Sequence, residues 1–367
     1  MQLKKLDSVG LIAILFCARC FSALTYFPFT FSNSAAYMLG ALLSAAIQLI
    51  ILLPAAALGK KYAGCDPCTL AAGRSRTLGV AVALAYLAYF SFESFIDVGN
   101  FSFFMTNFFA GSVMRETAVV CFVLAAVYLA AMPGSTVGKT AQYAFICILL
   151  LIGVTFIGAG SHADFANFNI AQRDMTRTVL RAAKSETARC ECLVLFVILM
   201  GSLDKDRSGS PPTHKTALIY LLLKTAAIEV TLTAVTLILG DYAFVTRLPF
   251  FSIASYSGSG ISERGDAVFL FVWIFTGVVK LGVLLHCCAK CIKVIAPRVS
   301  FFRAAAGSAA LPSAAAAAVT AAGSWEMFAY GEHGLWAIIL LSAILPAFML
   351  LMGRKEGYYG RAAAKAQ

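Results

Sequence analysis

The 367-residue chain has little charge and few histidines. Charged residues make up 13% of it, against about 25% in ordinary globular domains. Only 18 residues are acidic and 4 are histidine, and neither a P-loop nor a dinucleotide-binding glycine pattern occurs. With so few candidates, no Ser–His–Asp set can be argued either. We therefore expect a protein that is not an enzyme.

Long polar segments are also scarce. The longest are 59–77, 161–187, 241–266 and 353–367, and each is too short to build a hydrophobic core of its own. The sequence predicts one transmembrane domain over 1–352, followed by a short basic cytoplasmic tail over 353–367.

Apolar sequence fills the rest. Hydrophobic residues make up 60% of the chain and the mean hydropathy is +0.83. Apolar runs of about 20 residues cross the roughly 30 Å hydrocarbon layer as helices, which satisfy their own backbone groups there. We expect an all-α membrane protein with about ten spans: 8–29, 35–58, 78–109, 117–132, 141–160, 188–203, 217–240, 267–296, 304–322 and 334–352.

One of these spans, 78–109, is too long for a single upright helix. The excess length predicts either a strong tilt or a break near Gly99, where the backbone is permissive.

The basic residues are distributed unevenly between the two sides of the membrane. Most of the 29 Lys and Arg residues fall in segments on the same side as the N-terminus, which predicts that both termini are cytoplasmic. The net charge of +11 is then mostly cytoplasmic-face charge beside anionic lipid. The lipid bilayer is an expected partner, and nucleic acid is not.

Eleven cysteines are present, several in close pairs. Most lie in predicted spans or on the reducing side, where free cysteine behaves as a small hydrophobe. Since no second ligand pair accompanies the soluble-loop cysteines, we expect no metal and no cofactor. The motifs are CARC (Cys17, Cys20), CDPC (Cys65, Cys68), CEC (Cys190, Cys192) and HCCAKC (His286, Cys287, Cys288, Cys291).

Ionisable side chains inside the spans are the most informative residues. A charge near the middle of the membrane is costly, so such residues face a cavity or pair with one another. Glu93, Asp97 and Asn100 recur at helical spacing and share one inward face. Lys224 is near enough to the cytoplasmic interface to snorkel. The full set is Arg19, Glu93, Asp97, Glu191, Lys224, Glu229 and Lys280.

Three segments carry a family resemblance. The stretch LPFFSIASYSGSGISERGDAVFLFVWIF, residues 248–275, resembles the eighth-helix entry of the spore germination permease family, the B subunits of germinant receptors. CECLVLFVILMGSLDK, with Glu191, and LDSVGLIAILFCARCFSALTYFP are similar to its sixth and first helices. The chain departs from the family in GSTVGKTAQY, in RETAV and at Arg19.

This resemblance implies the fold of the amino-acid/polyamine permeases: two inverted five-helix repeats with broken first and sixth helices. The breaks are expected near Ala18–Ala23 and Leu195–Gly201, with the third and eighth helices closing a ligand pocket near mid-membrane. Candidate ligand-binding residues are Arg19, Cys20, Ser22, Glu93, Asp97, Asn100, Glu191, Trp273 and Lys280.

An acidic pocket suits an amine and Arg19 suits a carboxylate, a combination that fits an α-amino acid. The same residues equally fit an interhelical ion pair that only holds the bundle together. Outside the pocket, Glu263, Arg264 and Asp266 are expected to form an outer latch or docking surface, or else a solvated helix N-terminus.

Three functions follow as alternatives. The first is a ligand-sensing subunit of the spore inner membrane that binds a small germinant and signals to other germinant receptor subunits. The second is a proton-coupled amino-acid transporter in which Glu93, Asp97 or Glu191 titrates. The third is a structural receptor subunit without a ligand. The sequence alone leaves all three open, because they share one fold and one site.

The orientation is directly testable. In an otherwise cysteine-free background, Cys65 and a Gly360→Cys variant should each react with a membrane-impermeant thiol reagent only from the cytoplasmic side, because the positive charges favour that side. Labelling of either position from outside the cell would contradict the predicted orientation.

Overall fold

The structure is a computed structural model that describes residues 5–25, 34–108, 112–168, 174–204, 211–244, 246, 248–256, 265–323, 325 and 334–352. Within these ranges the chain is helical, and the β-structure is confined to one isolated bridge. The predicted all-α class is confirmed. The principal helices are α1 (Ser8–Thr25), α2 (Ser34–Lys61), α3 (Pro67–Arg74), α4 (Arg76–Phe108), α5 (Ser112–Ala130), α6 (Gly134–Ala159), α7 (Met175–Ala188), α8 (Cys192–Leu199), α9 (Thr213–Leu239), α10 (Pro249–Tyr256), α11 (Gly265–Ile295), α12 (Phe301–Ala321), α14 (Leu335–Ile339) and α15 (Leu345–Leu351).

Each of the ten predicted spans is occupied by helix. Among the described residues, seven helices are long and apolar enough to cross a membrane: α1, α2, α4, α6, α9, α11 and α12. α5 fills the fourth span, and α14, a π-helical turn over Leu340–Ile344 and α15 together fill the last. The sixth span is shared between the end of α7 and α8.

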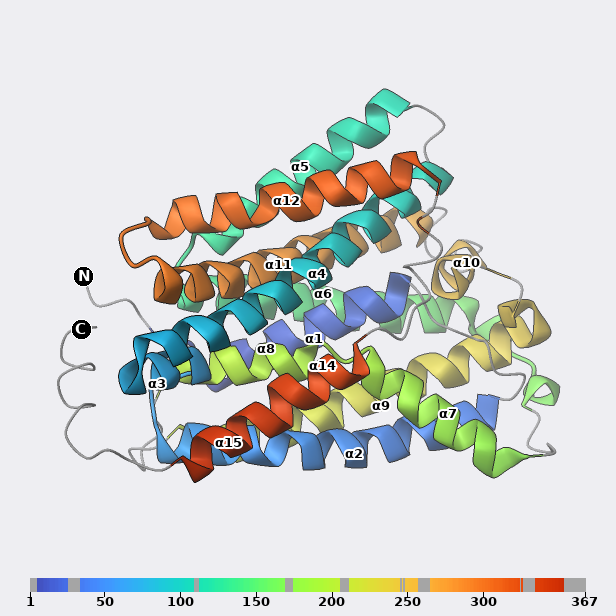
Figure 1. The fold of residues 1–367 in the computed structure, drawn as a ribbon. Helices are drawn as coiled ribbons and strands as arrows, with labels where there is room; N and C mark the ends of the chain where they lie inside the picture. Colours follow the sequence, from blue (N-terminus) through green and yellow to red (C-terminus); the bar gives the residue numbers. More distant parts are fainter. Residues whose placement is uncertain are drawn as a thin grey trace.

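Two short helices support the inverted repeat. α3 follows the second helix of the first half and α10 follows the second helix of the second half, and each has eight residues and begins with proline. They lie at opposite ends of the bundle, with α3 at the end where the termini lie (Figure 1). Equivalent elements at opposite ends are what an inverted repeat produces.

α4 runs without interruption through Gly99, so the break considered there is absent. Instead, the glycine lets the ring of Trp325 pack directly on the α4 backbone: a Cβ at this position would lie 2.0 Å from the ring. The indole N–H of Trp325 donates to the Oδ1 atom of Asn100 at 3.2 Å. The long third span is therefore one continuous helix with an aromatic side chain seated on it.

The breaks of the first and sixth helices are not where the resemblance placed them. α1 is continuous through Ala18–Ala23, a stretch without glycine or proline. The sixth helix is interrupted at residues 189–191, between α7 and α8, and stays helical through Leu195 to tighten only at Met200–Ser202.

The prediction that 161–187 is a polar loop is partly wrong as well. Its second half forms α7, which buries Ala182, Ala183 and Glu186 and exposes Arg177 and Arg181. This one-sided pattern is that of an amphipathic helix packed on a core.

α1 and α8 are joined at the end of the bundle where the termini lie. The N–H of Leu6 donates to the carbonyl of Ser202 at 3.0 Å, and the N–H of Asp204 donates to the carbonyl of Leu6 at 2.8 Å. Further along, the thiol of Cys192 donates to the carbonyl of Leu15 at 3.2 Å. These bonds fix the two helices side by side.

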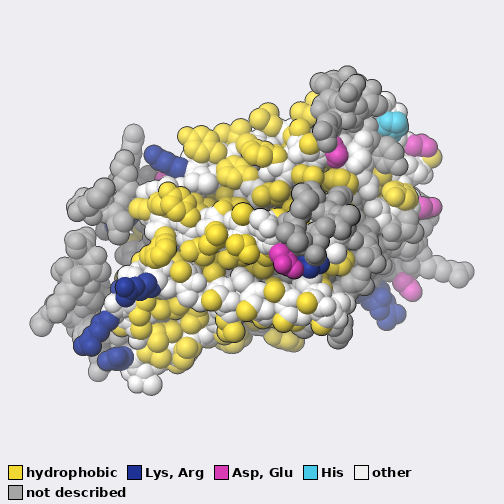
Figure 2. Space-filling view, turned by 90° about the horizontal axis from the view of Figure 1, so that it is seen from above, with side chains coloured by type: hydrophobic (Ala, Val, Ile, Leu, Met, Phe, Trp, Pro, Cys, Tyr) yellow, Lys and Arg dark blue, Asp and Glu magenta, His cyan; other side chains and the backbone are white. Residues whose placement is uncertain are grey.

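The visible surface is apolar between two charged ends. Figure 2 shows hydrophobic side chains over the middle of the molecule, several Lys and Arg at the end nearest the termini, and most of the visible Asp and Glu toward the other end, where Lys or Arg is also present. This distribution favours the predicted cytoplasmic location of both termini, which stays a prediction.

Gly99 provides a test of the packing around α4. Gly99→Val should lower the free energy of unfolding by about 1–3 kcal/mol, because the added side chain overlaps the ring of Trp325 and displaces it. Thermal unfolding of the detergent-purified protein measures this. Gly153→Ala on α6 is the matched control, since a Cβ there meets nothing within 4 Å. Equal unfolding temperatures for both variants would contradict the close packing.

Candidate functional site

The central site is a lysine held by three other helices. The Lys280 ammonium on α11 donates to Asp97 Oδ1 of α4 at 2.7 Å and to the Ser22 hydroxyl of α1 at 2.7 Å. It also pairs with Glu191 Oε1, directly before α8, at 2.9 Å. Ser22 in turn donates to the same Glu191 oxygen at 2.9 Å. Because an ammonium has three protons, Lys280 is fully bonded.

Carboxylates outnumber cations at this site. Asp97 and Glu191 both pair with Lys280, and Glu93, one helical turn before Asp97, interacts electrostatically with Glu191, Lys280 and Asp97. The second oxygen of Asp97 is buried and has no hydrogen-bond partner among the described residues. The site can therefore accept one more cationic or hydrogen-bonding group.

An aromatic cluster lies next to the central site, on the side of α10. The Trp273 ring stacks on Phe21 at 5.2 Å, on Phe101 at 5.4 Å and on Phe104 at 4.0 Å between ring centroids. Its indole N–H donates to Thr25 Oγ1 at 2.8 Å. Trp273 was predicted as a ligand contact, but its one polar group is already used.

Arg19 belongs to a second network, separate from the first. Its guanidinium makes a two-pronged pair with Glu186 near the end of α7. The ammonium of Lys224 on α9 lies 3.3 Å from Glu186 Oε1 and 2.9 Å from Gln48 Oε1. The ion-pair partner of Arg19 is therefore Glu186, while the charge of Glu191 also acts on Arg19. Lys224 does not snorkel to the interface, because its side chain is only 2% exposed.

Several members of this second network were missed by the sequence analysis. Gln48 donates to Ser44 at 2.8 Å, and Ser44 bonds to Thr187 at 2.9 Å. Glu186 was missed because it was assigned to an outer loop. The alternation of buried alanines with exposed basic residues over 175–188 was the signal that could have placed it on a packed helix.

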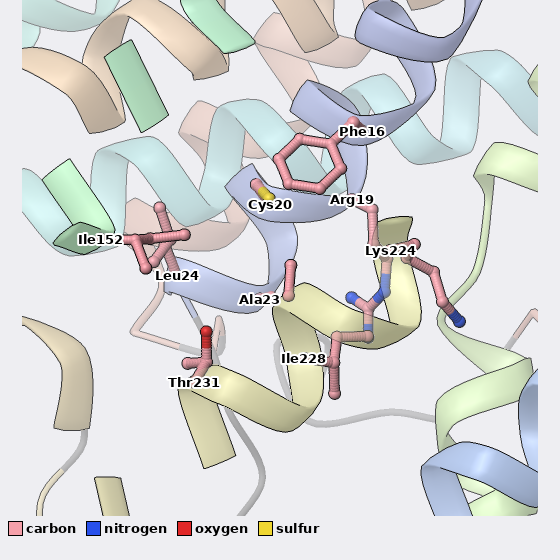
Figure 3. A pocket seen from close by; sticks show the side chains of 10 residues that line it. Phe16, Arg19, Cys20, Ala23, Leu24, Ile152, Lys224, Ile228 and Thr231 are labelled. Atoms are coloured by element: carbon pink, nitrogen blue, oxygen red, sulfur yellow. The ribbon is translucent and has the colours of Figure 1, made fainter. Parts of the chain in front are cut away.

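A narrow cleft borders Arg19 between α1, α6 and α9 (Figure 3). Cys20, Ala23 and Leu24 of α1 line it together with Ile152, Ile228 and Thr231. Its accessible space is about 20 Å³, room for about one water molecule. Arg19 and Cys20 therefore face a space too small for an amino acid in this conformation.

The remaining predicted site residues lie elsewhere. Asn100 accepts the bond from Trp325 and does not touch Lys280's ammonium. Asp266 is in the first turn of α11, where its carboxylate accepts from the N–H of Ala267 at 2.8 Å. Glu263 and Arg264 lie outside the described residues, so the outer latch stays a prediction.

Comparison with known proteins identifies the fold. No protein-family model matches the sequence, and no curated protein matches it. Among solved structures the chain is similar to Mhp1, a nucleobase-cation-symport-1 family transporter in a closed conformation with bromovinylhydantoin bound. The TM-score is 0.61 at 11% identity, over 95% of this chain and 93% of that one.

The likeness covers nearly the whole of both chains, so the chain has the fold of a multi-pass membrane transporter of this class. The predicted permease-type fold is confirmed. At 11% identity the likeness shows the fold alone, and the germination family stays a prediction.

The pairing of Arg19 with Glu186 can be tested by charge removal. Glu186→Gln should destabilise the protein by about 3–5 kcal/mol, because it leaves the buried cations of Arg19 and Lys224 without their counter-charge. Adding Arg19→Met should recover part of that loss, because one of the two unpaired cations is then removed. Thermal unfolding and the amount of protein in the membrane measure both effects. An Arg19→Met, Glu191→Gln double variant is the control, and recovery there instead would contradict the observed pairing.

Proposed function

We propose that this chain is a ligand-sensing membrane subunit of a spore germinant receptor that binds a small molecule, an amino acid, near mid-membrane. The observation that carries the proposal is Lys280, which ties α1, α4 and the start of α8 to α11 beside the interruption of the sixth helix. A ligand that competes for one of these contacts changes how four helices are held together. The three resembling segments favour the germinant receptor over other proteins of this fold.

The site chemistry fits the amine of an amino acid. Asp97 offers a buried carboxylate oxygen without a partner among the described residues, and a charge-assisted hydrogen bond from an ammonium would satisfy it. Arg19 is occupied by Glu186. We therefore assign the ligand's carboxylate to the N-terminal end of α8, where the helix dipole favours an anion.

A signalling role requires partner subunits and a defined membrane for this chain. In this proposal the chain lies in the spore inner membrane with both termini in the cytoplasm, and the rearranged helices act on other germinant receptor subunits. Glu263, Arg264 and Asp266 remain the proposed outer latch or docking surface.

A proton-coupled amino-acid transporter is the second candidate. The excess of carboxylates over cations around Lys280 favours it, since Glu93, Asp97 and Glu191 share one ammonium. The three carboxylates therefore carry more negative charge than the single ammonium can balance. The structural subunit without a ligand is the third reading, and it accounts for the full bonding of Lys280.

Binding and uptake measured side by side separate these functions. The protein, purified with its receptor partners and reconstituted in vesicles, is given labelled amino acids with and without a proton gradient. A sensor binds without accumulating label, whereas a transporter accumulates label that depends on the gradient. Absence of both would support the structural subunit and overturn the proposal.

Asp97 is the sharpest single test of the ligand site. Asp97→Asn should weaken binding of the amino acid by roughly 30- to 1,000-fold, which corresponds to about 2–4 kcal/mol, because the ligand loses a charge-assisted bond. Equilibrium binding of the labelled amino acid measures this, with thermal unfolding to confirm the fold. Glu116→Gln removes an exposed carboxylate on α5 and is the control. Unchanged affinity in a folded Asp97→Asn protein would move the site elsewhere.

A further inference from the structure

Two cysteine motifs that are far apart in the sequence meet in the fold. CDPC contributes Cys68 at the start of α3, and HCCAKC contributes Cys291 near the end of α11. The two cysteines are close enough to interact electrostatically, and both line one cavity. None of the functions proposed above uses this pair.

The cavity that they line has an accessible volume of about 370 Å³. It lies between α3, α8, α11 and α12, at the end of the bundle that carries the termini. Its wall contains Lys290, which is paired with Asp66 at 3.5 Å, and Lys293, whose charge makes the wall positive on balance. A space of this size and charge suits a small anionic molecule.

The donor set fits thiol chemistry better than a metal. Among the described residues, no group of three or more His, Cys, Asp and Glu side chains is arranged to hold a metal ion. A structural zinc site needs four such ligands. Two adjacent thiols, by contrast, are sufficient for a disulfide, and disulfides in a reducing compartment are typically transient and regulatory.

We propose that Cys68 and Cys291 form a reversible disulfide by exchange with an anionic low-molecular-weight disulfide that enters this cavity. One cysteine thiolate attacks a sulfur of the small disulfide, forms a mixed disulfide and releases one small thiol. The second cysteine then attacks the protein sulfur of the mixed disulfide and releases the second small thiol. Two protein thiols are oxidised, one small disulfide is reduced to two thiols, and the two protons pass to the released thiolates.

The surroundings of the pair set its pH dependence. The hydrogen bond from Cys291, burial and the charge of Asp66 raise the pKa of the Cys68 thiol, and the Lys290 ammonium opposes them. Lys293, also on the cavity wall, is bonded to the carbonyls of Pro297 and Val299. Because the thiolate is the attacking species, attack by Cys68 is slow at neutral pH and becomes faster as the pH rises.

A cross-link here would act on the broken sixth helix. The backbone of α3's N-cap, Asp66, packs directly on Gly201, where a Cβ would lie 2.5 Å from the Asp66 nitrogen. Gly201 is in the turn that ends the α8 segment. A disulfide between α3 and α11 therefore fixes α3 against the turn that ends α8. This restricts movement of the sixth helix.

Peptide mapping of the oxidised protein tests the proposal. The full-length protein is reduced, purified, and exposed to oxidised glutathione at pH 7.0 and pH 8.5, and its tryptic peptides are analysed by mass spectrometry without reduction. We expect a cross-linked peptide joining Cys68 to Cys291 that dithiothreitol removes. When Cys68 is the attacking residue, the rate of formation should rise by roughly tenfold per pH unit while its thiol remains mostly protonated.

Three variants complete the design. Cys68→Ser and Cys291→Ser should each abolish the cross-link, whereas Cys121→Ser, which removes an exposed thiol on α5, should leave it unchanged. The wild-type map stands even if a variant fails to fold. Recovery of Cys68 and Cys291 only as free thiols or as separate glutathione adducts, with the protein still folded, would overturn the proposal. A cross-link that joins other cysteines instead would also overturn it.

Discussion

A single buried ammonium governs the architecture of the centre. Lys280 is 2% exposed in the middle of α11, where an unpaired charge is too costly to keep. Its three protons therefore require three acceptors, and these come from α1, α4 and the residue before α8. The requirement fixes the relative positions of four helices at once. Lys280 also holds Glu191, and with it the start of α8, at the centre of the bundle.

The interruption of the sixth helix is stabilised from both sides. Glu186 before it is paired with Arg19 and Lys224, and Glu191 after it is paired with Lys280. α1 takes part in both networks, through Arg19 and through Ser22. A helix interruption that lies between two buried carboxylates paired with different cations has a defined geometry. Charge that enters or leaves either network therefore changes the stability of the break itself.

The sequence predicted the spans and the inward face of the third helix, because hydropathy and helical spacing depend on residues close in the chain. Asp97, Glu191 and Lys280 were recognised as candidates for the same reason. Glu186 was not foreseen as the partner of Arg19, since pairing depends on which helices pack together. Glu186 lies in a segment with basic residues and low hydropathy, so the sequence placed it outside the membrane. A break near Gly99 was one of two alternatives for the long third span, because the contact of Gly99 with the distant Trp325 could not be predicted from the sequence.

The joined pair of α1 and α8 has a mechanical consequence. The two helices are bonded at one end through Leu6 and residues 202–204, and at the other through Ser22 and Glu191. Two connected rods held at both ends tilt together and cannot slide past each other. A displacement of Leu6 is therefore transmitted along α1 to Ser22, which accepts a hydrogen bond from the Lys280 ammonium in the middle of the bundle.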